Sequence, residues 1–559
     1  MALSISTSCG LGYTQEKVMD PEKLATPKSG TTVNKSSELP AKRDFIDQAR
    51  HATVDEHEMT LGQAFKRYPK AIFWSIFLST AVIMEGYDSD LIYSFFGLPS
   101  FVERYGNLQS DGTHSVSAPW QNALGQGIMI GQFFGLFVTG WFTDLYGFKK
   151  TIGGACVAIS GFIFVLFFAP NIGTLLVGEI LLGLPLGVFL TLTTVYATEI
   201  SPLALRPYLT TYVNICWSIG KFLASAALKG YVNDPTSWSY RVPFAVQWMW
   251  PPIIMIAALF APESPWWLVR QDRPEDARRS LERLSTNASA EDLDNMLAAM
   301  VLTNQHEKAI EDGTSYWDCF KGSNLRRTEI ACMAQTMQPL VGFSLVLYST
   351  YFFQLNGISA SDAFSLSLGQ NGVALVAGVA IWFLFSSVGR RTIYLWGLAG
   401  CVIVEFTIGG LGVPEPRKAT SWSTGSLIIV FYAIYSLSIG PMSYILGFEV
   451  SSTRLRSKTA VLGRNAYHLG SVFNNTLTTY MINSSAWNWR GKTAFFWGGF
   501  SLLLWIWVFF RLPEVKDRSF AELDILFESG VPARDFKNTS VEAFVEENHL
   551  QPTATVNSL

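Results

Sequence analysis

Charged residues are scarce in this chain. Asp, Glu, Lys and Arg make up 15% of its 559 residues, whereas about 25% is usual for soluble proteins. The net charge of −3 gives no electrostatic basis for binding nucleic acid. The six cysteines show neither the spacing of metal ligands nor a disulfide framework. No catalytic triad, metal cluster or nucleotide-binding loop is present in the sequence. We therefore expect no enzyme activity, no metal, no cofactor and no nucleic-acid partner.

Long apolar runs take the place of the missing charge. Hydrophobic residues make up 49% of the chain, with 40 Phe and 18 Trp. A helix that crosses about 30 Å of hydrocarbon needs about 20 mostly apolar residues. Twelve segments fit this requirement and predict an all-α membrane protein in contact with lipid. They lie near residues 71–97, 120–142, 151–169, 173–197, 208–229, 242–261, 330–355, 365–385, 391–412, 424–448, 459–481 and 492–511.

The twelve predicted spans fall into two groups of six. A charged, helix-forming segment separates the groups, and a tail rich in Ser, Thr, Lys and Glu precedes them. The N-terminus has no apolar signal-peptide core, so the first span is expected to act as its own insertion signal. The expected units are a cytosolic, largely disordered tail over 1–68, a six-helix half over 69–261, a cytosolic helical linker over 262–329, a second six-helix half over 330–511 and a cytosolic tail over 512–559.

Basic residues near the ends of the spans predict the orientation. Lys149, Arg206, Arg390 and Arg456 all fall in short loops on the same side as both tails. Because Lys and Arg are enriched in cytoplasmic loops, we expect both termini to lie in the cytoplasm.

An internal repeat supports the division into halves. Glu199 is followed seven residues later by Arg206, and Glu449 is followed seven residues later by Arg456. The two pairs lie 250 residues apart, each just after the fourth span of its half. Duplicated halves with a binding site between them are typical of secondary transporters.

Two carboxylates interrupt the first predicted span. Glu85 and Asp88 are three residues apart, so both can face one interior of a helical bundle. An acid at membrane depth costs about 2.5–3.5 kcal/mol on insertion scales, so such residues usually line a polar pathway or pair with another group. This pair is the first candidate for a functional site.

Short motifs in both halves resemble one known family. They are Gly86-Tyr87-Asp88 in span 1, Gly140-x3-Asp144-x2-Gly147 after span 2, Glu199-x2-Pro202-x3-Arg206 after span 4, Pro262-Glu263-Ser264-Pro265 after span 6, Gly440-Pro441 with Glu449-x6-Arg456 in and after span 10, and Pro513-Glu514-Val515-Lys516 after span 12. Over about residues 65–535 the chain resembles the sugar porter family of the major facilitator superfamily. The wording of several motifs, such as Asn488-Trp-Arg-Gly-Lys-Thr493, is similar to that of fungal α-glucoside (maltose-type) permeases.

The resemblance implies a function and leaves two alternatives open. Fungal α-glucoside permeases are plasma-membrane proton symporters that import maltose and related disaccharides, so we expect sugar, protons and lipid as partners of a monomeric, multi-pass protein. A hexose facilitator or symporter is the nearest alternative. A non-transporting sugar sensor is the other, although the tail after Arg511 is only 48 residues long, which argues against it.

The family resemblance assigns the proton site to the carboxylates of span 1. In proton-coupled members, the Asp of the Gly-Tyr-Asp motif titrates, so Asp88 takes this role and Glu85 either binds a sugar hydroxyl or shares the proton. A helix-end cap or a structural ion pair is the alternative for Asp88. The family has an arginine in span 4 as the partner of this Asp, but this chain has Glu179 there. Either Glu179 and Asp88 hold a proton between them, or Lys221 of span 5 supplies the positive partner.

A sugar pocket needs hydrogen-bonding side chains and an aromatic face. The resemblance places such residues in both halves, and packing is the alternative for each of them. Lys221 stands where the family often has a pocket glutamine; its alternative is snorkelling to an interface. Several amides of hexose carriers are replaced here, which leaves room for a disaccharide. The predicted sugar ligands are Glu85, Asn214, Lys221, Gln338, Ser344, Tyr348, Tyr444, Tyr467 and His468.

Charged residues at the cytoplasmic face form the last predicted group. In the family such residues act as an exchangeable salt-bridge latch that closes the inside. Positive-inside topology alone is the alternative reading of the basic members. The predicted cytoplasmic gate comprises Asp144, Glu199, Arg206, Arg390, Glu449 and Arg456.

Overall fold

A computed structural model describes most of the chain. It covers residues 59–539 except 110, 111, 113, 203, 287, 312–314, 415, 416, 453, 454, 517, 519 and 538, and it also covers residues 48, 49, 51, 52, 55 and 56. The remainder of the N-terminal tail expected over 1–68 and the last residues of the C-terminal tail lie outside the described residues.

The first six predicted spans each contain a helix or a broken helix. The helices are α3 (Pro69–Phe95), α5 (Ala118–Tyr146), α6 (Phe148–Phe167), α7 (Ile172–Ile200), α8 (Arg206–Tyr231) and the broken span of α9 (Trp238–Val246), η2 (Gln247–Met249) and α10 (Trp250–Phe260). Shorter elements flank α3, namely α2 (Leu61–Arg67), α4 (Pro99–Tyr105) and the paired strands β1 (Asn107–Leu108) and β2 (His114–Ser115).

The second six spans repeat this pattern with two breaks. The elements are α14 (Gly322–Leu340), α15 (Ser344–Leu347) and α16 (Ser349–Leu355) in one span, then α17 (Ala360–Ser387), α18 (Arg390–Leu411), α19 (Lys418–Ser436) with α20 (Ile439–Glu449), α21 (Arg456–Ile482), η4 (Arg490–Lys492) and α22 (Thr493–Arg511). Pro339 and Gly342, whose φ is 76°, lie at the first break. Pro441 follows the second break, and because proline has no N–H, it cannot complete the helical hydrogen-bond ladder there.

Apolarity alone does not identify all of these spans. Nine helices or broken helices in the described part of the chain are long and apolar enough to cross a membrane. The remaining three, α3, α8 and α21, are 27, 26 and 27 residues long but carry ionisable side chains within their length. Ionisable residues inside a membrane usually mark functional sites. These three helices are therefore the first candidates to carry such a site.

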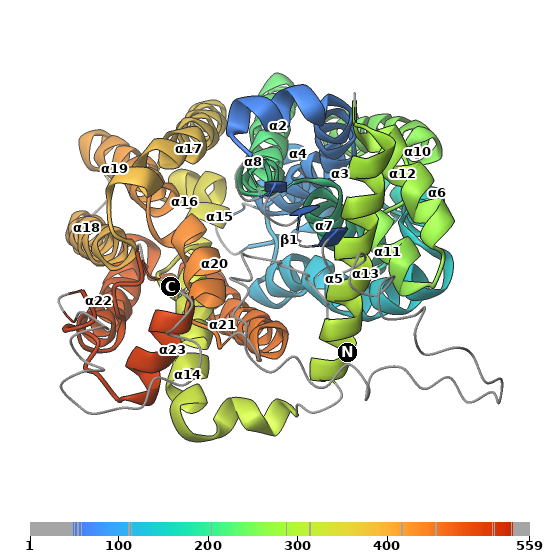
Figure 1. Ribbon diagram of the computed structural model, residues 1–559. Helices are drawn as coiled ribbons and strands as arrows, with labels where there is room; N and C mark the ends of the chain where they lie inside the picture. The colour runs from blue at the N-terminus through green and yellow to red at the C-terminus, as the bar shows by residue number, and fades with distance from the viewer. Residues whose placement is uncertain are drawn as a thin grey trace, which may run out of the picture.

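The helices gather into two groups that touch along three pairs. Figure 1 shows the first six spans, coloured blue to green, beside the last six, coloured yellow to red. Between the groups, α8 packs on α17, α5 packs on α21, and α3 packs on α15 and α16. The three ion-bearing helices α3, α8 and α21 therefore all lie at the interface between the halves.

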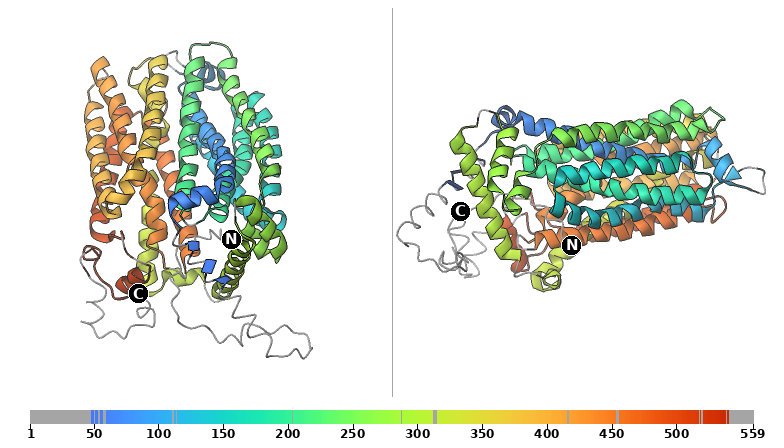
Figure 2. Two further views of the ribbon diagram at one scale, coloured as in Figure 1. Left: turned by 45° about the horizontal axis from the view of Figure 1, so that its top comes forward. Right: turned by 90° about the vertical axis from the view of Figure 1, so that its right-hand side faces the viewer.

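The connecting segments gather at one end of the bundle, which we call the linker end. Figure 2 shows the linker helices and the C-terminal helix there. These elements are α11 (Pro265–Arg270), α12 (Pro274–Leu284), α13 (Ala290–Glu311), η3 (Tyr316–Phe320) and α23 (Phe520–Glu528). Arg67 bonds to Asp292 of α13 at 2.8 Å. The helix of the seventh span, α14, begins at Gly322, before the apolar segment that starts near residue 330, and its first turns carry Arg326 and Arg327, which contact the tail through Val531 and Asp524.

Two glycines let α3 and α8 approach each other closely. A Cβ atom on Gly86 would lie 2.1 Å from the carbonyl oxygen of Trp217, and one on Gly220 would lie 2.0 Å from that of Ile83. Side-chain atoms cannot occupy such positions, so both glycines are needed to hold the acid pair of α3 against α8.

Gly220→Ala is therefore expected to destabilise the protein by about 1–3 kcal/mol, because the added methyl group forces the two helices apart. Thermal unfolding of the purified protein in detergent measures this effect. Gly230→Ala is the matched control, since a Cβ there on the same helix meets nothing within 4 Å. Equal melting temperatures for the two variants would contradict the close approach.

Candidate functional site

The acid pair lies in the interior of an unbroken helix. Glu85 and Asp88 are 6% and 1% exposed, and α3 continues past them to Phe95. The interpretation of Asp88 as a helix-end cap is therefore wrong. Gln132 of α5 donates to Glu85 Oε1 at 3.0 Å, and Gln247 of η2 donates to Asp88 Oδ1 at 2.7 Å. Both glutamines are neutral, so these hydrogen bonds do not balance a negative charge.

Glu179 lies in the same buried region, on α7. It is 0% exposed, and in the described part of the chain neither of its carboxylate oxygens has a hydrogen-bond partner. Glu179 and Asp88 interact electrostatically. Two negative charges close together without a cation are strongly unfavourable at low dielectric. Neither acid lies in an ion pair among the described residues.

Arg464 of α21 is a site residue that our sequence analysis missed. Its guanidinium donates to the Tyr444 hydroxyl at 3.1 Å and lies over the Tyr467 ring at 4.3 Å from the centroid. It also attracts Glu85 of the other half electrostatically. An arginine inside the predicted span 459–481 was the signal that could have revealed it. Arg464 brings three predicted sugar ligands, Glu85, Tyr444 and Tyr467, into one group.

Lys221 is buried at the interface between the halves. It is 1% exposed, so the interpretation that it snorkels to an interface is wrong. Its ammonium lies over the Trp217 ring at 4.4 Å, the Phe343 ring at 5.4 Å and the Tyr432 ring at 5.6 Å. The carboxylates that attract this ammonium are those of Asp90 and Glu85. The structure thus associates Lys221 with Asp90 and Glu85, and its pairing with Asp88 stays a hypothesis.

The predicted ligands on the seventh span have two different surroundings. Gln338 donates to Oε1 of Gln335, on the same helix α14, at 3.2 Å. Ser344 instead bonds to Asn474 and Asn475 of α21, and Tyr348 accepts a hydrogen bond from Thr479 at 2.7 Å. Ser344 and Tyr348 are both 0% exposed. These hydroxyl groups are thus engaged in holding the seventh span against α21.

Two further predicted ligands, Asn214 and His468, differ in their positions. Asn214 of α8 is exposed, and His468 of α21 is half-buried. The His468 ring packs against Tyr467 with centroids 5.5 Å apart, and its Nε2 has no hydrogen-bond partner among the described residues. The geometry therefore groups His468 with Tyr467 but leaves Asn214 apart.

The predicted gate residues lie at the linker end, where two of them form ion pairs. Glu199, at the end of α7, pairs with Arg270 of α11 at 2.7 Å and accepts a short hydrogen bond from Ser264. Glu449 of α20 pairs with Arg390 of α18 at 3.3 Å.

The two arginines of the repeat are placed differently. Arg206 donates to the backbone oxygen of Ser201 at 3.4 Å, and Arg456 is the first residue of α21. Among the described residues, Glu199 thus pairs with a guanidinium of the linker and Glu449 with one of α18. Asp144 is exposed, and only its carbonyl is engaged, by Gln271 at 2.9 Å.

A second duplicated feature explains the two Pro-Glu motifs. Glu263 accepts hydrogen bonds from the backbone N–H groups of Phe148 at 3.0 Å and Lys149 at 3.4 Å, at the start of α6. Glu514 likewise accepts one from Arg390 at 2.8 Å, at the start of α18. A carboxylate at a helix N-terminus satisfies free N–H groups and the helix dipole. Burial raises the pKa of Glu263, although these N–H groups oppose the shift.

Arg270→Met is expected to lower the melting temperature by several degrees. It would leave the Glu199 carboxylate, which is 0% exposed, without a cation, and loss of one partner from a buried pair costs about 3–5 kcal/mol. The half-exposed position of Arg270 places the expected value at the lower end. Thermal unfolding in detergent measures it, and Arg279→Met, which removes an exposed guanidinium, is the control. A drop no larger than that of the control would contradict a stabilising pair.

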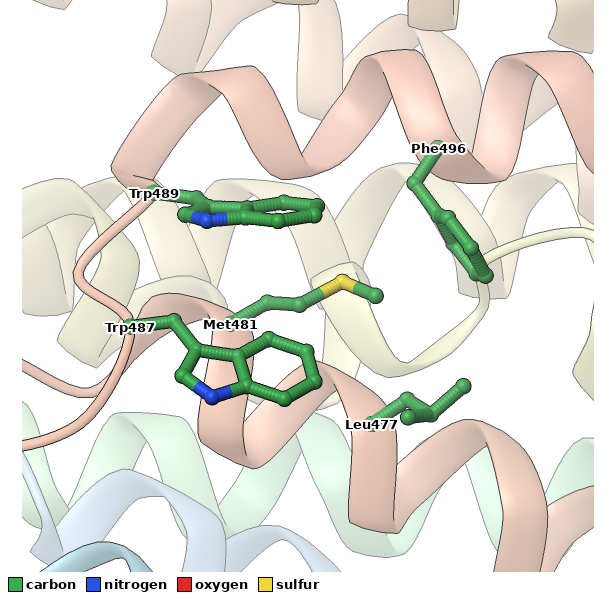
Figure 3. A pocket seen from close by; sticks show the side chains of 5 residues that line it. All are labelled: Leu477, Met481, Trp487, Trp489 and Phe496. Atoms are coloured by element: carbon green, nitrogen blue, oxygen red, sulfur yellow. The ribbon is translucent and has the colours of Figure 1, made fainter.

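A cavity of about 570 Å³ lies elsewhere, between α21 and α22. Figure 3 shows the indole rings of Trp487 and Trp489 with Met481 between them, and Leu477 and Phe496 completing the wall. This lining offers almost no hydrogen-bonding groups for sugar hydroxyls. The polar group around Glu85, Lys221 and Arg464 is chemically better suited to a sugar.

Comparisons with known sequences agree on one family. The family described as "Sugar (and other) transporter" matches residues 74–527. A general alpha-glucoside permease of Saccharomyces cerevisiae is 40% identical over 504 residues, covering 89% of this chain and 82% of the permease. The maltose permease MAL31 of the same yeast is 42% identical over 514 residues, covering 90% of this chain and 83% of that protein.

Solved structures show the same architecture. The inward-open xylose transporter XylE from E. coli matches with a TM-score of 0.65 and 18% identity, over 81% of this chain and 99% of that protein. XylE bound to 6-bromo-6-deoxy-D-glucose, titled a proton:xylose symporter of the major facilitator superfamily, gives a TM-score of 0.64. The expected fold, twelve transmembrane helices in two six-helix halves joined by a helical linker, is thereby confirmed. This chain belongs to the sugar transporter family.

Proposed function

We propose that this protein is a plasma-membrane proton symporter that imports α-glucosides such as maltose by alternating access. The observation that carries the proposal is the buried set of carboxyl groups at Glu85, Asp88 and Glu179, next to a cationic and aromatic group at Arg464. The relatives named as α-glucoside and maltose permeases support the choice of substrate.

Proton binding is assigned to Asp88 together with Glu179. Gln247 donates to one oxygen of Asp88, and the other, Oδ2, has no partner among the described residues. A proton on this pair removes the repulsion between the two carboxylates. Departure of the proton toward the cytoplasm restores the repulsion, so the charge state of the pair changes once in each transport cycle.

Sugar binding is assigned to the group that Arg464 organises. Glu85 can accept a hydrogen bond from a sugar hydroxyl, Arg464 can donate one, and Tyr467 offers a ring face for the C–H surface of a sugar. Asn214, Lys221, Gln338, Tyr444 and His468 complete the proposed pocket. Ser344 and Tyr348 are proposed to support the pocket by holding the seventh span against α21, since their hydroxyl groups bond to that helix.

The linker end is proposed to face the cytoplasm and to carry the gate. The sequence pattern puts both tails and the basic loops on one side of the membrane, and basic loops are typical of the cytoplasmic side, which supports the orientation. The pairs Glu199–Arg270 and Glu449–Arg390 each hold one half together at this end. Exchange of these partners for residues of the opposite half, including Arg206, Arg456 and Asp144, would close the inner side.

Transport energetics fit a single coupled proton. Moving one positive charge through 100 mV releases about 2.3 kcal/mol, which supports an accumulation of about 50-fold. Any pH difference across the membrane adds to this value.

The test is uptake of labelled maltose by yeast cells that lack α-glucoside carriers, with the external pH recorded. Expression of the full chain is expected to give maltose uptake accompanied by alkalinisation of the medium. Equilibration of sugar without proton movement would instead indicate a facilitator. Uptake of glucose but not maltose would indicate a hexose carrier, and binding without uptake of any sugar would indicate a sensor.

A further inference from the structure

A buried polar network surrounds Lys221 and includes an acid that the proposed transport cycle does not use. Asp90 of α3 is 8% exposed. It accepts hydrogen bonds from Ser225 Oγ at 2.8 Å and from Asn371 Nδ2 at 3.3 Å. The Asn371 amide also contacts Ser225 Oγ at 2.7 Å and the backbone oxygen of Lys221 at 3.4 Å. Three helices, α3, α8 and α17, meet in this network.

The surroundings of Lys221 explain why an acid is needed there. The three aromatic rings around the ammonium stabilise a cation through their π faces, but they carry no net charge. A buried cation is costly unless an anion compensates it. Asp90 and Glu85 are the two carboxylates that attract the ammonium, and Glu85 is also attracted to Arg464. Glu85 is thus shared between two cations, whereas Lys221 is the cation that acts on Asp90, which shares a hydrogen-bond network with it through Asn371.

We propose that Asp90 is a positioning residue that keeps Lys221 in the sugar site as a charged hydrogen-bond donor, and that Asn371 of the opposite half fixes the Asp90 carboxylate. This inference rests on the proposed function of the same site and assigns its second charged pair. The first pair, Glu85 with Arg464, joins α3 to α21. The second, Asp90 with Lys221, lies within the first half, and Asn371 of α17 connects it to the second half through hydrogen bonds to the Asp90 carboxylate and the Lys221 backbone oxygen.

The assignment also separates the acids of α3 by role. Asp88 accepts a hydrogen bond from the neutral Gln247 and lies in no ion pair among the described residues, which suits a group that gains and loses a proton. Asp90 has a cation nearby and two hydrogen-bond donors on its carboxylate, which suits a group that stays ionised. Two acids only two residues apart thus carry different functions because they point to different neighbours.

The experiment is a double-mutant cycle with Asp90→Asn, Lys221→Gln and the double variant. Each single variant leaves one buried charge uncompensated, whereas the double variant leaves none. The apparent KM for maltose is expected to rise about tenfold in each single variant and to recover only in part, to about threefold above the wild-type value, in the double variant, because the buried charges are then balanced but the ammonium donor is lost. The number of protons taken up per maltose is expected to stay unchanged in the double variant.

Lys229→Gln combined with Asp90→Asn is the matched control. Lys229 lies on the same helix and also reaches the other half, through Ser361 at 2.6 Å, but it does not take part in the network around Asp90. No rescue is expected for this combination. A purely structural role of Asp90 would lower the maximal rate through loss of folded carrier and leave KM unchanged, which would overturn the proposal.

A second cycle uses no substrate and separates this inference from the proposed function. Melting temperatures of the purified full-length variants in detergent are expected to fall in both single variants and to recover in the double variant. Additive losses in this cycle would overturn the pairing of Asp90 with Lys221. Recovery of stability in a protein that transports no maltose would uphold the pairing and reject the proposed substrate. Loss of proton movement in Asp90→Asn without rescue by Lys221→Gln would make Asp90 a proton carrier and overturn the proposal.

Discussion

Asp88→Asn is expected to abolish proton-driven accumulation of maltose while sugar binding is retained. The asparagine side chain has nearly the same shape as aspartate, and its oxygen can accept the hydrogen bond that Gln247 donates at 2.7 Å. It cannot bind or release a proton. The variant therefore removes the change in charge on which coupling depends, and the accumulation ratio is expected to fall from about 50-fold at 100 mV to about 1.

The measurement is steady-state uptake of labelled maltose together with the external pH. Maltose is expected to equilibrate across the membrane in the variant, with no alkalinisation of the medium. Glu275→Gln is the control, because this acid is exposed on α12 at the linker end and belongs neither to the buried carboxyl groups nor to the proposed gate. Accumulation of maltose above the external concentration by Asp88→Asn would show that the proton binds elsewhere, and Glu179→Gln would then be the next variant to examine.

Arg464→Met is expected to lower the uptake efficiency for maltose by about 10- to 150-fold. Hydrogen bonds to charged groups are worth about 1.5–3 kcal/mol each, and Arg464 bonds to Tyr444 at 3.1 Å and stacks on Tyr467 at 4.3 Å. Methionine keeps much of the volume of the side chain but supplies neither contact. It also leaves Glu85 without the cation of the opposite half.

Initial rates of uptake over a range of maltose concentrations measure this effect. Arg464→Lys keeps the charge but not the planar guanidinium, so we expect it to recover only part of the activity. Lys492→Met, which removes an exposed cation at the far end of α22, is the control for a general loss of positive charge. Wild-type kinetics in Arg464→Met would exclude the arginine from the sugar site and leave Lys221 as the cation that binds substrate.

The local pattern of the sequence was sufficient to predict the architecture. Apolar runs identify most of the membrane spans, because a span must be long and apolar enough to cross the hydrocarbon by itself, and α3, α8 and α21 are the long helices that ionisable residues interrupt. The repeat was equally visible, since Glu199 and Glu449 occupy matching places in the two halves. The buried acids at Glu85 and Asp88 were recognised for the same reason, because a charge inside an apolar run is conspicuous without knowledge of its neighbours.

The partners of these charges were not predictable in the same way. Asp88 and Gln247 are 159 residues apart, Glu85 and Gln132 are 47 apart, and Asp90 and Asn371 are 281 apart. In the structure, Glu199 pairs with Arg270 and Glu449 pairs with Arg390. No periodicity relates such positions, because each distance depends on how whole helices pack.

The number of membrane helices and the identity of those that carry charge could thus be predicted from the chain alone. The enclosure of Lys221 by Trp217, Phe343 and Tyr432, and the electrostatic interaction of Arg464 with Glu85, emerge from the packing of the two halves. The physical reason is that hydrophobicity acts on each residue separately, whereas the balance of buried charges depends on pairs of residues that meet only when the two halves pack together.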